Sequence, residues 1–371
     1  MTLIDSLDVF RVVVPLPEPL FVWGNVIKQR EFVFARVRSG NHVGTGYGLG
    51  RVAGIAEAIE RHLRPLVVGA NTHDIRRIWT AARASMRMIG DGGVFARALG
   101  IVDIALWDLH AQLLNMSLWQ LLGGARRDLP CIAICGYYQP DDPMGKVRRD
   151  AERLTQAGYT RFKLPIGEDI DLDVRRVSAL REVVGKDAMI GVDASGSFDT
   201  LKQAQVAIRA LEPCGIAFFE DPFPATHWQL AIELARTQPL PIAFGESLSS
   251  PHDMQQLGAS NAIDILRPDA THQMGITGFM QAIATATENH ISIFPHYFPD
   301  IHASLAAAFG AAWIEESPDE ADTVGFRVLR ATQPLIQRGA WSLSDAPGLG
   351  IDWDEAVLVR FRLDAQNSRN D

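Results

Sequence analysis

Three carboxylates stand at the ends of three successive strand-like runs, and they are Asp193, Glu220 and Glu246. They lie 27 and 26 residues apart, a repeat that holds one strand, one helix and two short loops. In a barrel of parallel strands, neighbouring strand ends converge on the carboxyl-terminal rim. Converging carboxylates repel one another unless a cation lies between them, and oxygen-only ligand sets favour Mg²⁺. The pattern therefore predicts a barrel, a metal and the place of the site; the alternative is three separate helix caps or solvated loop acids.

The next strand-like runs extend this series of polar strand ends. Asp269 follows the sixth run and His296 the seventh. A carboxylate beside an imidazole raises the basicity of the imidazole and fixes its tautomer, so the two residues are predicted to form a catalytic dyad. The alternative is a structural His after Pro295. Glu315 closes the ring at the eighth run, although its neighbour Glu316 leaves the choice between the two open.

Strand-like and helical runs alternate from about residue 130. The strand candidates are 131–136, 160–164, 188–193, 215–220, 241–246, 262–266, 290–295 and 311–315. Helical patterns fit between most of them, for example over 171–184. Eight parallel strands of this kind are expected to close into an α/β barrel.

The first 128 residues have a different texture. Residues 1 to about 50 are typical of a β-meander, in which a Pro-rich loop, Pro15–Gly24, joins the first two strands and carries Phe21 and Trp23. Residues 53–122 follow as helices, so the region is predicted to be an α+β domain. We expect this domain over 1–128, the barrel over 129–315, and a segment over 316–371 that returns to the first domain.

Composition excludes several classes of protein. The chain has 371 residues, of which 47% are hydrophobic and 21% charged, with a net charge of -9. This charge argues against nucleic acid or an anionic membrane as partner, and no apolar run is long enough to span a membrane. The three cysteines lack metal-site spacing and fall in apolar runs, which predicts reduced, buried thiols in a cytoplasmic protein.

Several short motifs, in this order, resemble the enolase superfamily and within it the mandelate racemase subgroup (mandelate racemase/muconate lactonizing enzyme-like). They are Ile104–Asp108, Leu121–Gly124, Phe219–Pro222, Gly245–Ser247, Pro268–Ala270, Gly275–Gly278, Pro295–His302 and Trp313–Glu315. The resemblance implies a modified TIM-type (β/α)7β barrel with an α+β capping domain built from the N-terminal region and the C-terminal tail. It also implies a homo-oligomer, with an octamer as one form, that acts on a small-molecule carboxylate.

The same resemblance assigns roles to the residues of the ring. Asp193, Glu220 and Glu246 would hold one Mg²⁺ per subunit, and His296 with Asp269 would be the general base. The reaction would begin with removal of a proton α to a substrate carboxylate.

One position departs from the family pattern. Family members carry Lys-x-Lys at the end of the second barrel strand, whereas this chain has Lys163 followed by Pro165. Lys163 is expected to contact the substrate carboxylate or the metal region, but proline cannot take a proton, which disfavours two-base racemisation. We therefore predict a dehydratase that converts an acid sugar, an aldonate or aldarate, to a 2-keto-3-deoxy acid. The alternatives are replacement of the missing Lys by Arg161 or Tyr138, a racemase, epimerase or cycloisomerase, and a non-catalytic carboxylate-binding protein.

Substrate contacts are expected from the cap and from the barrel rim. The candidates are Ser195, Tyr47, Arg51, Trp23, Tyr138 and His302, with Phe21 and Tyr137 near them. Ser195 stands where the family usually has Asn and can still donate a hydrogen bond. The second carboxylate of an aldarate would need a cation, for which Lys28, Arg30 and Arg51 are the candidates.

Overall fold

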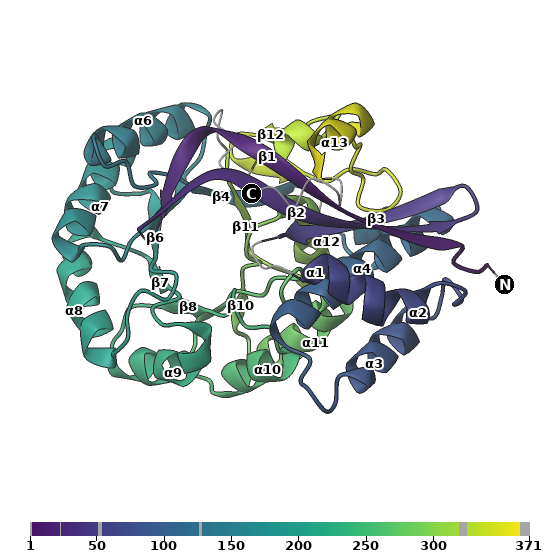
Figure 1. Cartoon of the computed structure of the whole chain (residues 1–371). Coiled ribbons are helices and arrows are strands. Elements are labelled where there is room, and N and C mark those ends of the chain that lie inside the picture. Colours follow the sequence, from purple (N-terminus) through teal and green to yellow (C-terminus); the bar gives the residue numbers. More distant parts are fainter. Residues whose placement is uncertain (1, 23, 51–53, 126–127, 319–324, 364–371) are drawn as a thin grey trace.

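The computed structural model describes residues 2–22, 24–50, 54–125, 128–318 and 325–363, and within them a barrel and a cap are evident (Figure 1). The barrel strands are β4 (Asp128–Ile134), β5 (Arg161–Pro165), β6 (Met189–Asp193), β7 (Phe218–Glu220), β8 (Ile242–Phe244), β9 (Ile265–Leu266), β10 (Ser292–Ile293) and β11 (Ile314–Glu316). Consecutive strands from β4 to β10 pair in parallel, and β11 pairs in parallel with β4. Every one of the eight predicted strands is present, although β9 and β10 have only two residues each.

Helices surround the barrel strands, as the alternating pattern predicts (Figure 1). They are α6 (Pro143–Gln156), α7 (Ile170–Val184), α8 (Leu201–Leu211), α9 (Trp228–Thr237), α10 (Pro251–Ala259), α11 (Gly275–Glu288) and α12 (Pro299–Phe309). Short 3₁₀ turns follow α8 at Glu212–Cys214 and precede α9 at Ala225–His227, and a third lies after the barrel at Arg327–Leu329. In α8, Thr200 and Gln203 form a capping box, and Ala204, Ala207 and Leu211 face the core at helical spacing. These helices leave the carboxyl ends of the strands open on one side of the barrel.

The cap is a four-stranded antiparallel sheet covered by helices. Its sheet has the order β14-β1-β2-β3, with β1 (Ser6–Val22), β2 (Asn25–Ser39), β3 (His42–Leu49) and β14 (Arg362–Leu363). Its helices are α1 (Ile55–Ala58), a π-helical turn (Ile59–Leu63), α2 (Arg64–Val67), α3 (Ile75–Ser85), α4 (Gly93–Leu113) and α5 (Leu118–Leu121). Most of α4 is buried because it lies between this sheet and the barrel helix α11. Gly46 permits the close approach of β3 to α4, since a Cβ there would lie 1.9 Å from the carbonyl oxygen of Ile101.

The predicted Pro-rich loop is a strand over most of its length, which corrects the sequence interpretation. β1 continues to Val22 and pairs with β2 beyond a register irregularity between Pro15 and Leu20. Its other neighbour, β14, pairs only with Arg11 and Val12. The prolines therefore lie beyond this pairing, where a strand tolerates residues that cannot donate a hydrogen bond. The result is a long hairpin that reaches across the barrel mouth (Figure 1).

The segment after Glu316 joins both parts of the molecule. Its hairpin of β12 (Ile336–Gln337) and β13 (Ala340–Ser342) pairs antiparallel with β4, so part of the segment extends the barrel sheet. The following helix α13 (Glu355–Phe361) and strand β14 return to the cap, where β14 pairs with β1. The three cysteines are free and buried. Among the described residues, no helix combines the length and apolar character needed to cross a membrane.

Candidate active site

Three carboxylates meet at the carboxyl ends of β6, β7 and β8. Asp193 and Glu220 are the last residues of their strands, and Glu246 lies two residues beyond β8. One oxygen from each lies within 4.8 Å of the other two, and all three residues are buried. Glu220 Oε2 and Glu246 Oε2 are buried without a hydrogen-bond partner. Buried, unpartnered carboxylate oxygens that converge in this way fit a hard divalent cation.

The ionisation of these carboxylates points to the same cation. Burial, then the charges of Asp193, Asp221 and Glu220, raise the pKa of Glu246 well above its ordinary value. Burial also disfavours ionisation of Glu220, but Arg267 and Lys163 outweigh it and lower its pKa to about 2. A divalent ion would favour the ionised form of Glu246, because the ion would supply the positive charge that the cluster lacks.

Two buried cations lie beneath the carboxylates. Lys163 Nζ lies 3.0 Å from Asp193 Oδ2, 3.0 Å from Glu220 Oε1 and 2.8 Å from Glu315 Oε2. Arg267 donates to Glu220 Oε1 at 2.8 Å and also to Glu315. Burial alone would lower the pKa of Lys163, yet Asp193 and Glu220 outweigh it and raise the pKa. Lys163 is therefore a charged residue in the floor of the site.

Glu315, rather than Glu316, belongs to this cluster. Successive strand residues point to opposite faces, so Glu316 points away from the cluster and pairs with Arg327 and with the Tyr159 hydroxyl. The structure thus settles the choice that the sequence leaves open.

His296 and Asp269 form a hydrogen-bonded pair beside the carboxylates. His296 Nδ1 lies 2.9 Å from Asp269 Oδ2, while Asp269 Oδ1 accepts from the Thr271 amide at 2.7 Å and from its hydroxyl at 2.8 Å. The carboxylate only accepts, so Nδ1 carries the proton and Nε2 keeps its lone pair. Nε2 lies 3.1 Å from Glu246 Oε2, without hydrogen-bond geometry. Burial, against the attraction of Asp269, lowers the pKa of His296 to about 4, so His296 is neutral at pH 7 and can accept a proton.

The cavity around these groups has walls from the cap and from the barrel. The barrel side includes Lys163, Pro165, Ser195, His296 and Tyr137. On the cap side, the β1–β2 hairpin contributes the apolar residues Leu20, Val22 and Ile27. Two arginines, Arg30 of β2 and Arg97 of α4, also line the cavity. Pro165 faces the cavity at the place where the family has its second Lys, and so presents no group that could carry a proton. Such a site can hold a polar anion under an apolar lid.

Only some of the predicted substrate contacts reach this cavity. Ser195 lines it, and its hydroxyl donates to Asp193 Oδ1 at 2.8 Å. Tyr47 is fully buried against Phe326 and Trp353, because the cap and the C-terminal segment close over it. Trp23 and Arg51 lie outside the described residues.

Tyr138 and His302 lie behind the cavity wall. The Tyr138 hydroxyl donates to Asp173 Oδ1 at 2.6 Å, and its neighbour Tyr137 lines the cavity instead. His302 is fully buried, and its Nδ1 donates to the Tyr297 carbonyl at 2.6 Å. Arg161, the other proposed replacement for the missing Lys, packs its guanidinium over the Trp313 ring, away from the cavity lining.

The polar residues of the wall and floor that the sequence interpretation missed include Arg267, His272 and Arg97. Arg267 lies two residues before Asp269, the spacing that puts both on one face of a strand, so alternation could have revealed it. His272 Nδ1 donates to the Glu246 carbonyl at 2.7 Å, and burial lowers its pKa to about 3. Arg97 lies on α4, far from the site in sequence, and no local signal marks it. For a distal carboxylate, Arg30 lines the cavity whereas Lys28 is exposed.

Comparison with known proteins identifies the family to which this chain belongs. Residues 6–123 match the Mandelate racemase / muconate lactonizing enzyme N-terminal domain, and residues 146–357 match the Enolase C-terminal domain-like family. Arabinonate dehydratase of Saccharolobus solfataricus is 28% identical over 85% of this chain and 87% of its own. 3,6-anhydro-alpha-L-galactonate cycloisomerase of Streptomyces coelicolor is 30% identical over 84% of each chain.

A solved structure extends the likeness over nearly the whole fold. L-talarate dehydratase from Polaromonas sp. JS666, crystallised in complex with Mg and L-glucarate, has a TM-score of 0.87 and 26% identity, with 98% of both chains covered. The chain therefore belongs to the mandelate racemase/muconate lactonizing enzyme family of the enolase superfamily.

Proposed function

We propose that this protein is a Mg²⁺-dependent dehydratase that converts an acid sugar, an aldonate or an aldarate, to a 2-keto-3-deoxy acid. The observation that carries the proposal is a cavity in which the imidazole of His296 pairs with Asp269, and in which a proline, Pro165, stands where a second base would stand. Relatives that act as dehydratases on arabinonate and on L-talarate/galactarate support the same choice.

Asp193, Glu220 and Glu246 would hold the Mg²⁺, since oxygens of the three lie within 4.8 Å of one another, and Glu220 Oε2 and Glu246 Oε2 are buried without another partner. Bound Mg²⁺ would supply positive charge against the second negative charge that develops on the substrate carboxylate. Lys163, charged and within 3.0 Å of two of these acids, adds further positive charge at the same place.

His296 would perform both proton transfers. Nε2 takes the proton from the carbon α to the carboxylate, while Asp269 holds Nδ1–H and stabilises the imidazolium that forms. The imidazolium then gives that proton to the β-hydroxyl as the Cβ–O bond breaks, and water leaves. The remaining enol becomes the 2-keto-3-deoxy acid by moving its hydroxyl proton to Cβ. One residue suffices, which agrees with a proline at position 165.

A cycloisomerase is the second candidate, because a relative at 30% identity has that activity and such a reaction also needs only one base. The two are separated by their products. Loss of a β-oxygen after removal of the α-proton gives a 2-keto acid in either case, so semicarbazide alone does not separate the two reactions. The product of a dehydratase is lighter than its substrate by one water, whereas opening of a sugar-acid lactone or anhydride gives an isomer of the same mass. A racemase is disfavoured, since Pro165 offers no base on the second face.

The deciding experiment is a screen of aldonates, aldarates and their lactones with Mg²⁺, scored with semicarbazide and by product mass, on the wild type and on His296→Asn. His290→Asn is the matched control, because His290 is exposed and its left-handed backbone, with φ of 58°, suits Asn. A 2-keto product lighter by one water from one or two sugars, lost in His296→Asn and kept in His290→Asn, would establish the dehydratase. A product isomeric with a lactone substrate, with no loss of water, would instead establish the cycloisomerase. Absence of any product and of α-proton exchange in D₂O would exclude both.

A further inference from the structure

The turn that carries Asp269 is held by contacts from the cap. This turn, here called the dyad turn, runs from Asp269, three residues beyond β9, to Met274 before α11. Within it, the amides of His272 and Gln273 donate to the Asp269 carbonyl at 3.1 and 2.9 Å. The dyad turn therefore moves as a unit with the first residues of α11, and whatever fixes those residues also fixes Asp269.

The helix α11 lacks a capping side chain of its own. Met274, at its N-cap, adopts a left-handed backbone with φ of 63° and provides no side-chain hydrogen bond. Asp103 of the cap helix α4 takes that place: it accepts from the Thr277 amide at 2.8 Å and from the Thr277 hydroxyl at 2.7 Å. A carboxylate at a helix N-terminus satisfies free amides and interacts favourably with the helix dipole. Asp103 is 1% exposed, so solvent cannot replace it.

Two tryptophans of the cap bind the same few residues. Trp79 Nε1 donates to the Met274 carbonyl at 2.8 Å, and Trp107 Nε1 donates to Thr277 Oγ1 at 3.0 Å. Trp107 lies one helical turn after Asp103 on α4. A chain of donors thus runs from Trp107 through the Thr277 hydroxyl to Asp103.

The backbone of α4 also contacts the dyad turn directly. A Cβ at Gly100 would lie 3.0 Å from the Ala270 carbonyl oxygen and 3.1 Å from that of Thr271. On the barrel side, His302 Nε2 accepts from the Ala270 amide at 3.0 Å. The dyad turn therefore packs between α4 of the cap and α12 of the barrel.

We propose that α4 sets the position of the Asp269–His296 pair, with Asp103 as the positioning residue. The inference rests on the proposed function in one respect, that this pair is the general base. Asp103 hydrogen-bonds to Thr277 and not to His296 or the carboxylate cluster, so it acts through Thr277 and the dyad turn. Replacement of Asp103 should then disturb the His296–Asp269 hydrogen bond without removing any group from the cavity.

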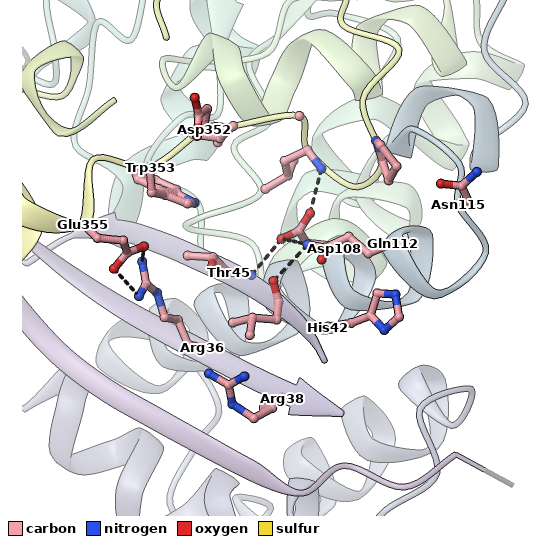
Figure 2. A pocket seen from close by; sticks show the side chains of 15 residues that line it. Arg36, Arg38, His42, Thr45, Asp108, Gln112, Asn115, Asp352, Trp353 and Glu355 are labelled. Atoms are coloured by element: carbon pink, nitrogen blue, oxygen red, sulfur yellow. Dashed lines mark hydrogen bonds and ion pairs between the residues drawn. The ribbon is translucent and has the colours of Figure 1, made fainter. Parts of the chain in front are cut away.

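Asp103→Asn is the test, and Asp108→Asn is its matched control. Asp108 lies on the same helix, is 5% exposed, and accepts from Thr45, Gln112 and Leu349. These partners belong to β3, to α4 and to the C-terminal segment, so none lies on the dyad turn. Figure 2 shows Asp108 beside Thr45 and Gln112. Both variants therefore lose a buried carboxylate of one helix, but only the first disturbs α11. Thr277→Val is a milder variant that removes one hydroxyl and keeps Asp103.

The first readout is the Nδ1–H signal of His296 in the NMR spectrum of protein labelled with ¹⁵N-histidine, assigned with His296→Asn and recorded without substrate. We expect Asp103→Asn to shift or broaden this signal, Thr277→Val to do so less, and Asp108→Asn to leave it unchanged. The second readout is turnover, where we expect kcat to fall about 10- to 100-fold in Asp103→Asn with little change in KM.

An unchanged His296 signal in Asp103→Asn would overturn the proposal. Equal changes in Asp108→Asn would overturn it as well, since they would show general loss of cap packing. If no acid sugar is converted by the wild type, the proposed function fails, whereas the NMR comparison still decides the role of Asp103.

Discussion

At the scale of single residues, Lys163 determines whether the carboxylate cluster can be buried. It lies within 3.0 Å of acids from three different strands and is 2% exposed. Loss of one partner from a buried ion pair leaves a charge without compensation, which typically costs about 3–5 kcal/mol. We expect Lys163→Met to lower the free energy of unfolding by about that amount, measured by urea denaturation at pH 7 without metal. Lys186→Met, at an exposed lysine, is the control, and equal effects in both variants would contradict this role.

The same scale shows how far the sequence predicts the site. Asp193, Glu220, Glu246, Asp269 and His296 were predictable as neighbours because each ends a strand or follows one within three residues, and barrel geometry brings strand ends together. The substrate contacts were not, since they depend on how cap and barrel meet. Tyr47 and Tyr138 are aromatic residues near that meeting, but packing buries them, whereas Arg97 reaches the cavity from a helix whose sequence indicates only a core.

At the scale of elements, the β1–β2 hairpin was the part that the sequence misrepresented. Prolines between Pro15 and Pro19 indicated a loop, but a strand beyond the pairing with β14 accommodates them. The end of the hairpin packs through a small cluster of its own, formed by Leu16, Leu20 and Val22 with Ile27 and Tyr137. A satellite cluster of this size gives local order to one element and contributes less than the main core.

Leu20→Ala tests whether the hairpin end opens independently. Leu20 is 3% exposed and lines the cavity. We expect faster amide hydrogen exchange over residues 16–22 and 24–27 and a loss of less than about 1 kcal/mol in global stability. Leu7→Ala is the contrast, because Leu7 is 1% exposed in the main core of the cap, and there we expect a global loss of about 2–5 kcal/mol. A global loss of that size in Leu20→Ala would show that the hairpin unfolds only with the whole protein.

At the scale of the whole molecule, α4 joins three parts of the chain that are distant in sequence. Asp103 binds the barrel, and Asp108 binds β3 and the C-terminal segment at Leu349 (Figure 2). Helical periodicity predicts that α4 exists, but it cannot show which buried acid binds which segment. That information lies in tertiary contacts between residues more than 60 positions apart.

Asp108 should make stability depend on pH. Burial, only partly offset by its three donors, raises the pKa of Asp108 to about 6, whereas an unfolded Asp titrates near 4. Between about pH 4 and 6 the folded protein therefore holds a proton that the unfolded chain has released, so this contribution to stability is lost as the pH rises. From pH 4 to pH 7, we expect the free energy of unfolding of the wild type to fall by up to about 3 kcal/mol relative to that of Asp108→Asn, measured by urea denaturation. A difference that stays constant with pH would contradict it.

Metal binding should also stabilise the whole molecule, because the ion would join three strands through acids that repel one another without it. At a Mg²⁺ concentration about 100 times the dissociation constant, the gain is about 2.7 kcal/mol, visible as a rise in Tm. Glu246→Gln should compare differently with the wild type in the absence and in the presence of Mg²⁺. Without metal it replaces an acid whose pKa burial and the acidic neighbours raise, so Tm should equal or exceed that of the wild type. Addition of Mg²⁺ should leave the Tm of Glu246→Gln unchanged, since one ligand is lost. If Mg²⁺ also left the Tm of the wild type unchanged, the metal site itself would be contradicted.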